Sequence, residues 1–220
     1  MYRKYFKRPF DIACAILALT VFSWLYLLIA ILVRIKLGNP VIFKQKRLGK
    51  DEKVFTLYKF KSMTDEVDDN GQLLPDSKRL SNFGRFLRAS SFDEIASVIN
   101  ILKGDLSIVG PRPLIVEYLP FYKEDERKRH TIKPGLTGLA QVEGRNALDW
   151  NEKLSFDVKY VENIKFSEDI RLIIKSITYF YNYKSTFSGE VIYLNDGRVV
   201  RPLNIERSVN NQVYNITDVQ

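Results

Sequence analysis

The chain has 220 residues, of which 34 are Lys or Arg and 26 are Asp or Glu, so its net charge is +8 at pH 7. This length supports one substantial core and disfavours a second independent domain. The positive charge favours anionic partners such as lipid headgroups, nucleotides or nucleic acid. The single cysteine, Cys14, excludes a disulfide within the chain, and the single histidine, His130, excludes a histidine-rich metal site.

An apolar segment of about 22 residues, 12–33, is long enough as a helix to cross a bilayer. Lys and Arg flank both of its ends. A helix that spans a membrane normally concentrates its basic residues on the cytoplasmic side. Two basic flanks therefore predict a re-entrant membrane hairpin, with an ordinary spanning helix as the alternative. Asp11, at the head of the segment, is expected to pair with Lys7 and Arg8 or to be solvated at the interface.

Short strands and an amphipathic helix are predicted after this segment. Two β-rich runs, 41–43 and 54–58, predict a β-hairpin. Residues 64–81 are polar and acidic and predict an exposed loop. Residues 79–88 carry apolar side chains at helical spacing among arginines. This pattern predicts a basic amphipathic helix, which either packs on the core or lies on a membrane surface.

Two adjacent carboxylates, Asp93 and Glu94, precede a helical pattern that should end at Lys103-Gly104. They fall in the first helical turn, where the helix dipole stabilises anions. Such a pair can hold a divalent cation, or one member can act as a nucleophile while the other binds metal. The alternative is a capping box between Ser91 and Glu94 with no catalytic role. Downstream, two prolines restrain the backbone around Arg112, whose planar guanidinium suits phosphate.

The region that follows combines charged and glycine-rich segments. The charged run 123–129 is typical of a solvated helix face. The glycine-rich segment 134–146 can approach a ligand closely through its backbone, and Arg145 could bind phosphate. Neither a dinucleotide-binding glycine motif nor a P-loop occurs.

The C-terminal third is predicted to contain helix, a hairpin and a tail. Residues 150–183 have a helical pattern, and Asn195-Asp196-Gly197 is a strong hairpin signal. Three parts are therefore expected along the chain: a membrane anchor at 1–36, a cytoplasmic catalytic domain at 37–203 and a polar tail at 204–220.

Six motifs follow one another between residues 2 and 183. They are Phe6-Lys7-Arg8-Pro9-Phe10-Asp11, Gln45-x-Arg47-x-Gly49, Tyr58-Lys59-Phe60-Lys61-Ser62-Met63, Asp93-Glu94, Gly110-Pro111-Arg112-Pro113 and Pro134-Gly135-Leu136-Thr137-Gly138. In this order they resemble the bacterial sugar transferase family, the small monotopic phosphoglycosyl transferases. That family usually has Ser-Pro in the middle of the membrane hairpin, whereas this chain has Ser23-Trp24.

The resemblance implies transfer of a sugar 1-phosphate from a UDP-sugar to undecaprenyl phosphate, with release of UMP, at the cytoplasmic face of the bacterial inner membrane. The sugar is expected to be of the N,N′-diacetylbacillosamine type or another N-acetylated sugar, and the cofactor Mg²⁺. By matching position, Asp93 is the nucleophile that forms a covalent phosphosugar intermediate, and Asp93 and Glu94 hold the metal. The substrate-binding positions that match are Lys59, Arg88, Arg112, Arg145 and Asp157.

The fold expected is α+β and mainly α, with a re-entrant membrane helix, amphipathic surface helices and short β-hairpins. The alternative function is a membrane-anchored basic protein that binds acidic lipid or nucleic acid without catalysis. Nucleic acid is not an expected partner, because the aromatic residues are not interleaved with base-reading polar residues.

Overall fold

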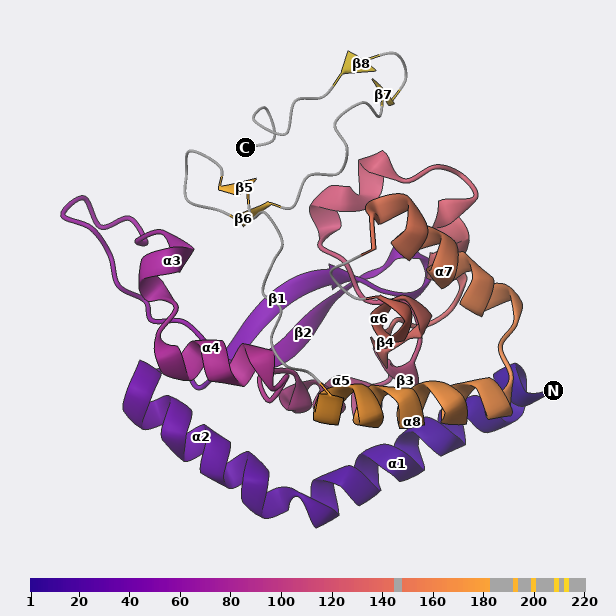
Figure 1. The fold of residues 1–220 in the computed structure, drawn as a ribbon, viewed down its shortest axis with the longest axis horizontal. Helices are drawn as coiled ribbons and strands as arrows, with labels where there is room; N and C mark the ends of the chain where they lie inside the picture. Colours follow the sequence, from indigo (N-terminus) through magenta and orange to yellow (C-terminus); the bar gives the residue numbers. More distant parts are fainter. Residues whose placement is uncertain (145–147, 183–191, 194–198, 201–207, 210–211, 214–220) are drawn as a thin grey trace.

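The fold is that of a computed structural model, which describes residues 1–144 and 148–182 and the pairs 192–193, 199–200, 208–209 and 212–213. The described residues are mainly helical and contain two-stranded sheets, as the α+β expectation requires (Figure 1). Arg145 and the turn expected at 195–197 lie outside the described residues, as does most of the tail. The short strands β5 (Ile192–Tyr193) and β6 (Val199–Val200) that flank this turn are paired antiparallel.

The N-terminal segment forms two helices joined by a sharp bend. A π-helical turn, η1 (Tyr2–Phe6), leads into α1 (Lys7–Val21), and α2 (Ser23–Leu37) follows with a bend of 67°. At the bend, Thr20 and Ser23 donate hydrogen bonds to backbone carbonyls one turn earlier, a pattern that often bends helices. The bend therefore forms without proline. Among the described residues no single helix is long and apolar enough to cross a membrane, whereas the bent pair has the length and composition to do so.

The two helices form a V whose apex points away from the rest of the protein (Figure 1). On the inner side, Ala15 of α1 packs with Val98 and Ile101, and Val33 of α2 packs with Leu87. The opposite side of the V carries exposed apolar side chains: Ile16, Leu17, Val21, Phe22, Trp24, Leu27, Leu28, Ile31 and Ile35.

The hairpin predicted after the V is confirmed, and its first strand is longer than predicted. Strand β1 (Ile42–Leu48) pairs antiparallel with β2 (Val54–Phe60), and η2 (Lys50–Glu52) joins them. The prediction ended the first strand at residue 43, because the sequence from 44 to 47 is polar. Pairing with the apolar strand β2 satisfies its backbone and overrides this weak local preference.

The basic helix predicted at 79–88 is confirmed as α4 (Asn82–Ala89), which begins where the Ser81 hydroxyl accepts a hydrogen bond from Gly84 N at 3.1 Å. A short helix, α3 (Asp76–Arg79), lies in the segment 64–81 that was predicted to be a loop. The helix of the acid pair consists of η3 (Glu94–Ser97) and α5 (Val98–Lys103). It ends at Gly104 in the left-handed conformation, as predicted.

A parallel pair of short strands, which the sequence analysis did not predict, crosses the core. Strand β3 (Ser107–Val109) lies beside β4 (Gly135–Thr137). Between them run the 3₁₀ helices η4 (Val116–Phe121) and η5 (Glu126–Thr131), and α6 (Leu139–Glu143) follows β4.

The helical segment at 150–183 is divided. A capping box between Asp149 and Glu152 starts α7 (Trp150–Glu162), and α8 (Phe166–Asn182) begins after a break. In Figure 1, α4, α5 and α8 lie at one level between the V and the rest of the domain. These three helices expose a further set of apolar side chains: Phe86, Ile99, Leu102, Phe166, Ile174 and Ile177.

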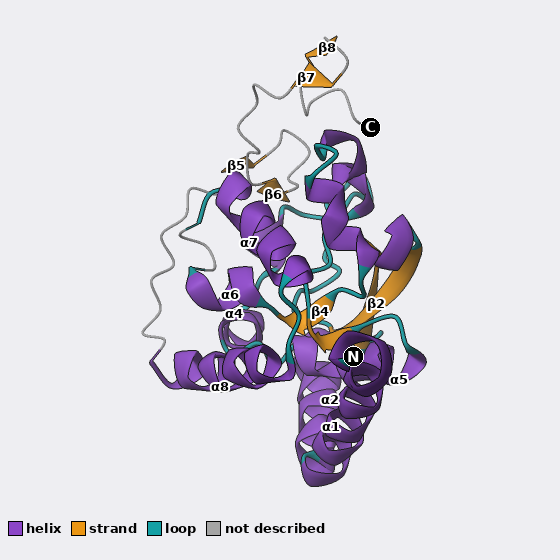
Figure 2. Cartoon of the chain, turned by 90° about the vertical axis from the view of Figure 1, so that its right-hand side faces the viewer, coloured by secondary structure: helices purple, strands orange, loops and turns teal. Residues whose placement is uncertain are grey.

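Buried polar contacts fix the start of α1 to the domain. Lys7 Nζ donates to Asp169 Oδ2 at 2.6 Å and to the Tyr160 hydroxyl at 3.1 Å. The Tyr2 hydroxyl donates to the same carboxylate at 2.7 Å, and Asp169 is completely buried on α8. These contacts attach the N-terminal end of the V to the domain. The apex of the V projects away from the domain, as Figure 2 shows from the side.

The interface contacts expected for Asp11 do not form. Asp11 is buried and accepts hydrogen bonds from Ser107 Oγ at 2.8 Å and Ile108 N at 3.1 Å. Arg8 instead donates to the carbonyls of Ile101 and Leu102 at the end of α5. The prediction was wrong because each side chain meets a partner from the domain instead: Asp11 binds Ser107 and Ile108, Lys7 binds Asp169, and Arg8 binds the end of α5.

We expect Lys7→Met to destabilise the protein, because it leaves the buried Asp169 carboxylate without its cation. Breaking such a pair costs about 3–5 kcal/mol, which corresponds to a decrease in Tm of roughly 10 °C for a chain of this size. Thermal unfolding of the detergent-solubilised protein measures the change. Lys4→Met removes an exposed lysine one turn earlier and should leave Tm unchanged. An unaltered Tm in Lys7→Met would show that the pair does not fix the anchor.

Candidate active site

The acid pair stands at the start of a helix that is fixed to strand β2. Phe60 N donates to the carbonyl of Asp93 at 2.8 Å, and Ser97 Oγ donates to the carbonyl of Tyr58 at 2.7 Å. One turn later, the buried Asn100 side chain accepts from Tyr58 N and donates to Thr56 O. These bonds hold the carboxylates at a constant position relative to β2 and its lysine.

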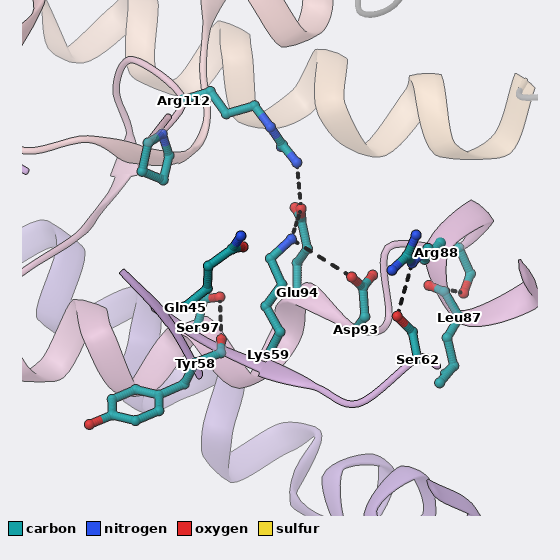
Figure 3. A network of polar contacts seen from close by, with 12 residues as sticks. Gln45, Tyr58, Lys59, Ser62, Leu87, Arg88, Asp93, Glu94, Ser97 and Arg112 are labelled. Carbon is teal, nitrogen blue, oxygen red and sulfur yellow. Dashed lines mark hydrogen bonds and ion pairs between the residues drawn. The ribbon is translucent and has the colours of Figure 1, made fainter. Parts of the chain in front are cut away.

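Glu94 is bound by two cations that come from different elements. Lys59 Nζ, on β2, and Arg112 Nη2, on the loop after β3, each donate to Glu94 Oε1 at 2.7 Å (Figure 3). No side-chain capping bond forms at the start of this helix among the described residues. The capping-box interpretation is therefore wrong, because the carboxylate that it requires is bound to Lys59 and Arg112 instead.

The charges around Glu94 keep it ionised. Burial by itself would raise the pKa of Glu94. The charges and hydrogen bonds of Arg112 and Lys59 outweigh burial and hold the pKa of Glu94 well below its ordinary value. Glu94 therefore carries a full negative charge at neutral pH.

Asp93 has a different environment from its neighbour. Its carboxylate is buried, and Lys59 Nζ lies 3.8 Å from Oδ2, which is too far for a strong hydrogen bond. Burial raises the pKa of Asp93, against the opposing charge of Lys59, and Glu94 raises it further. No hydrogen bond from the described residues engages the Asp93 side chain. Of the two carboxylates, Glu94 is hydrogen-bonded to two cations, whereas Asp93 accepts no hydrogen bond from the described residues and is available to a ligand.

Arg88 reaches Asp93 from helix α4. Its Nε donates to Ser62 Oγ at 2.9 Å, and its charge opposes the rise in the pKa of Asp93 (Figure 3). The helix comes this close because residue 84 is glycine, where a Cβ would lie 1.9 Å from the carbonyl oxygen of Ser62. Thus Lys59, Arg88 and Arg112, all expected at the site from the resemblance, are brought together around Asp93 and Glu94.

Asp157 lies apart from this group and acts on it through another residue. It is buried on α7 and pairs with Arg129, whose Nε and Nη2 both donate to Asp157 Oδ2. Arg129 also donates to the backbone carbonyl of Arg112 at 2.7 Å and to the Tyr122 hydroxyl at 2.8 Å. His130 packs edge-on against the Tyr122 ring. Asp157 thus supports the Arg112 loop through Arg129, and its substrate contact stays a prediction.

Arg129 is the important side chain that the sequence analysis missed. It stands in the charged run 123–129, which was predicted to be solvated. The prediction is wrong here, because the Arg129 side chain is 1% exposed. A buried arginine requires a carboxylate, and its carboxylate comes from α7, 28 residues away. No local pattern indicates such a partner.

The acid pair could hold a divalent cation together with substrate oxygens. Among the described residues no group of three or more His, Cys, Asp or Glu side chains converges on a metal position. Mg²⁺ does not need such a cage, since it is usually bound by one or two carboxylates with waters and substrate phosphates. Glu94 is ionised, and none of the described residues donates a hydrogen bond to Asp93 Oδ1 or Glu94 Oε2. These oxygens fit a metal shared with a phosphorylated substrate.

The comparisons with known proteins agree with this geometry. Residues 2–182 match the family described as bacterial sugar transferase. The chain belongs to this family. It is similar to the uncharacterised sugar transferase EpsL of Bacillus subtilis (strain 168), with 50% identity over 171 residues that cover 78% of this chain and 85% of EpsL.

Two further relatives of the family carry more specific names. The undecaprenyl-phosphate galactose phosphotransferase of Salmonella typhimurium is 36% identical over 190 residues, which cover 79% of this chain. The UDP-N-acetylgalactosamine-undecaprenyl-phosphate N-acetylgalactosaminephosphotransferase of Aeromonas hydrophila is 34% identical over 184 residues, which cover 79% of this chain. The matched regions span 40% and 43% of the lengths of these relatives.

We expect Arg112→Lys to lower transferase activity by roughly tenfold or more. Lysine keeps the charge beside Glu94, but it loses the planar fork that can bind a carboxylate and a phosphate together. Arg112→Ala should lower activity further. Steady-state UMP release measures both variants, with Arg85→Lys, an exposed arginine of α4, as the matched control. Wild-type activity in both Arg112 variants would exclude a role for this side chain in the reaction.

Proposed function

We propose that the chain transfers a sugar 1-phosphate from a UDP-sugar to undecaprenyl phosphate and releases UMP. The observation that carries this proposal is the unequal acid pair, in which Glu94 is bound by Lys59 and Arg112 while Asp93 is free of hydrogen bonds from the described residues. Membership of the bacterial sugar transferase family and the activities named for two relatives support it.

Asp93 is the proposed nucleophile. Its carboxylate oxygen attacks the sugar-side phosphorus of the UDP-sugar, an aspartyl–phosphosugar bond forms, and the pyrophosphate bond breaks with its electron pair leaving on UMP. In the second half, a phosphate oxygen of undecaprenyl phosphate attacks the same phosphorus, and the Asp93 carboxylate leaves. Each half exchanges one P–O bond for another, so no oxidant or reductant is needed.

The cations around Asp93 make this attack possible, because a carboxylate must approach a doubly charged diphosphate. Lys59, Arg88 and Arg112 converge on the acid pair and offset part of that charge. Asp93 and Glu94 are the residues proposed to hold Mg²⁺, which when bound neutralises further charge on the phosphates. Arg145, outside the described residues, remains a proposed substrate ligand from the resemblance alone.

For the sugar, we propose an N-acetylated hexose, including the N,N′-diacetylbacillosamine type. The printed name of the Aeromonas hydrophila relative gives N-acetylgalactosamine, whereas that of the Salmonella typhimurium relative gives galactose. UMP release from a panel of UDP-galactose, UDP-N-acetylgalactosamine, UDP-N-acetylglucosamine and UDP-N,N′-diacetylbacillosamine decides among them. Preference for UDP-galactose would contradict this choice of sugar.

We further propose that the V of α1 and α2 enters one leaflet of the inner membrane from the cytoplasmic face and returns. The Lys7–Asp169 pair holds one end of the V at the domain, and α2 leads directly into β1 at the other end. The exposed apolar residues of the V then lie in hydrocarbon, and those of α4, α5 and α8 lie at the lipid interface.

The covalent step predicts a burst of UMP. Enzyme mixed with UDP-sugar and Mg²⁺, without undecaprenyl phosphate, should release about one UMP per active site and gain the mass of the phosphosugar on the peptide that contains Asp93. Asp93→Asn should lose both signals, because an amide cannot attack. Glu94→Gln should retain the mass gain at a reduced rate and with weaker dependence on Mg²⁺. UMP that appears only after the lipid is added would indicate direct transfer in a ternary complex.

The re-entrant arrangement predicts that both ends of the V face the cytoplasm. In a Cys14→Ala background, Lys4→Cys should be protected from a membrane-impermeant thiol reagent in intact cells and labelled after the membrane is permeabilised. Lys46→Cys, an exposed position on β1, is the matched reporter for the catalytic domain. Labelling of Lys4→Cys but not Lys46→Cys in intact cells would establish a helix pair that spans the bilayer.

A further inference from the structure

Strand β1 presents two polar side chains to the site, Gln45 and Arg47. Alternate residues of a strand point to opposite faces, so these two share one face. Both are partly buried, whereas Lys46, which lies between them, and Lys44, which precedes Gln45, are exposed. In Figure 3 the Gln45 amide lies near Glu94, on the side of Arg112 rather than that of Asp93.

Arg47 is held between Gln45 and the loop that carries Arg112. Its Nη2 donates to Gln45 Oε1 at 2.6 Å, and its Nη1 donates to the carbonyl of Pro113 at 3.3 Å. The guanidinium is therefore fixed beside the residue that follows Arg112 in the chain. Three of its five N–H groups remain after these bonds: one on each terminal nitrogen and that of Nε, which is buried without a partner among the described residues.

The charge of Arg47 has no carboxylate bonded to it among the described residues. Its two acceptors, the Pro113 carbonyl and the Gln45 amide oxygen, are neutral, whereas Arg112 pairs with Glu94 and Arg129 with Asp157. Burial, and then the neighbouring charge of Arg112, lowers the pKa of Arg47 to about 10, although Glu94 and Glu117 act in the opposite direction. Arg47 thus stays protonated at neutral pH beside a second guanidinium, an arrangement that an anion would stabilise.

We propose that Arg47 binds the phosphate group of the leaving UMP together with Arg112, and that Gln45 positions Arg47 for this contact. This inference rests on the proposed transferase function. It names the residues that bind the phosphate on the nucleotide side of the UDP-sugar. Arg112 and Gln45 lie on one side of Glu94, and Asp93 and Arg88 lie on the other (Figure 3). Since Asp93 attacks the sugar-side phosphorus, the cations across Glu94 face the phosphate that departs with uridine. Two arginines there stabilise the charge that develops as the pyrophosphate bond breaks.

Binding of UMP and of uridine to the full chain in lipid nanodiscs, measured by calorimetry, tests the assignment. Arg47→Gln should weaken UMP binding by about tenfold or more, the usual effect of losing a charge-assisted hydrogen bond. Uridine, which lacks the phosphate, should bind within about twofold of the wild-type affinity. Arg47→Lys should retain part of the UMP affinity because it retains the charge. Lys46→Gln, the adjacent cation on the opposite face of β1, should leave both affinities unchanged.

A purely structural role for Arg47 gives a different result. If Arg47 only supports the Pro113 carbonyl, Arg47→Gln will either lower the affinities for UMP and uridine equally or leave the affinity for UMP unchanged. Either outcome overturns the assignment. Should Arg47→Gln fail to fold, Gln45→Ala removes the orienting acceptor and should still lower UMP affinity selectively. A wild-type chain that neither binds UMP nor releases it from any UDP-sugar would refute the transferase function itself. Normal turnover with unchanged UMP affinity in Arg47→Gln and Gln45→Ala would refute only this assignment.

Discussion

The site depends on one partly buried carboxylate, Glu94, that is bound by two cations from distant parts of the chain. Lys59 arrives from a strand and Arg112 from a proline-restrained loop, so their meeting at Glu94 fixes three elements relative to one another. Removing a carboxylate from water is unfavourable unless its charge is balanced, and two short charge-assisted bonds provide that balance. Glu94 thereby keeps Lys59 3.8 Å from Asp93, close enough to offset its charge and too far to bind it tightly.

Buried ion pairs recur wherever the fold must join segments that are far apart in sequence. Arg129 and Asp157 hold the backbone of the Arg112 loop, and Lys7 with Asp169 ties the first helix to the last long helix. Each pair is almost completely shielded from solvent, so breaking it leaves an uncompensated charge. This cost makes the alternative packings of a small, mainly helical domain unfavourable and keeps the site and the V of α1 and α2 in one arrangement.

The V of α1 and α2 and the site share the same structural elements. Helix α5, which begins behind the acid pair, packs against α1 through Val98 and Ile101. Its outer side exposes Ile99 and Leu102. Under the proposed function, a helix that starts at the acid pair and presents apolar side chains outward would bring a water-soluble nucleotide sugar and a membrane-bound acceptor to one place.

The sequence by itself determined the apolar anchor, the first hairpin, the helix behind the acid pair and its glycine end, because each depends on local periodicity or backbone preference. It also indicated, through the order of the motifs, that Lys59, Arg88 and Arg112 belong with Asp93 and Glu94. Only the tertiary structure decided which carboxylate is bound and which is free, because that choice depends on distances between elements. It also decided the burial of Arg129, the parallel strands β3 and β4 and the partners of Asp11. These depend on contacts between residues that are distant in the chain and leave no periodic signal.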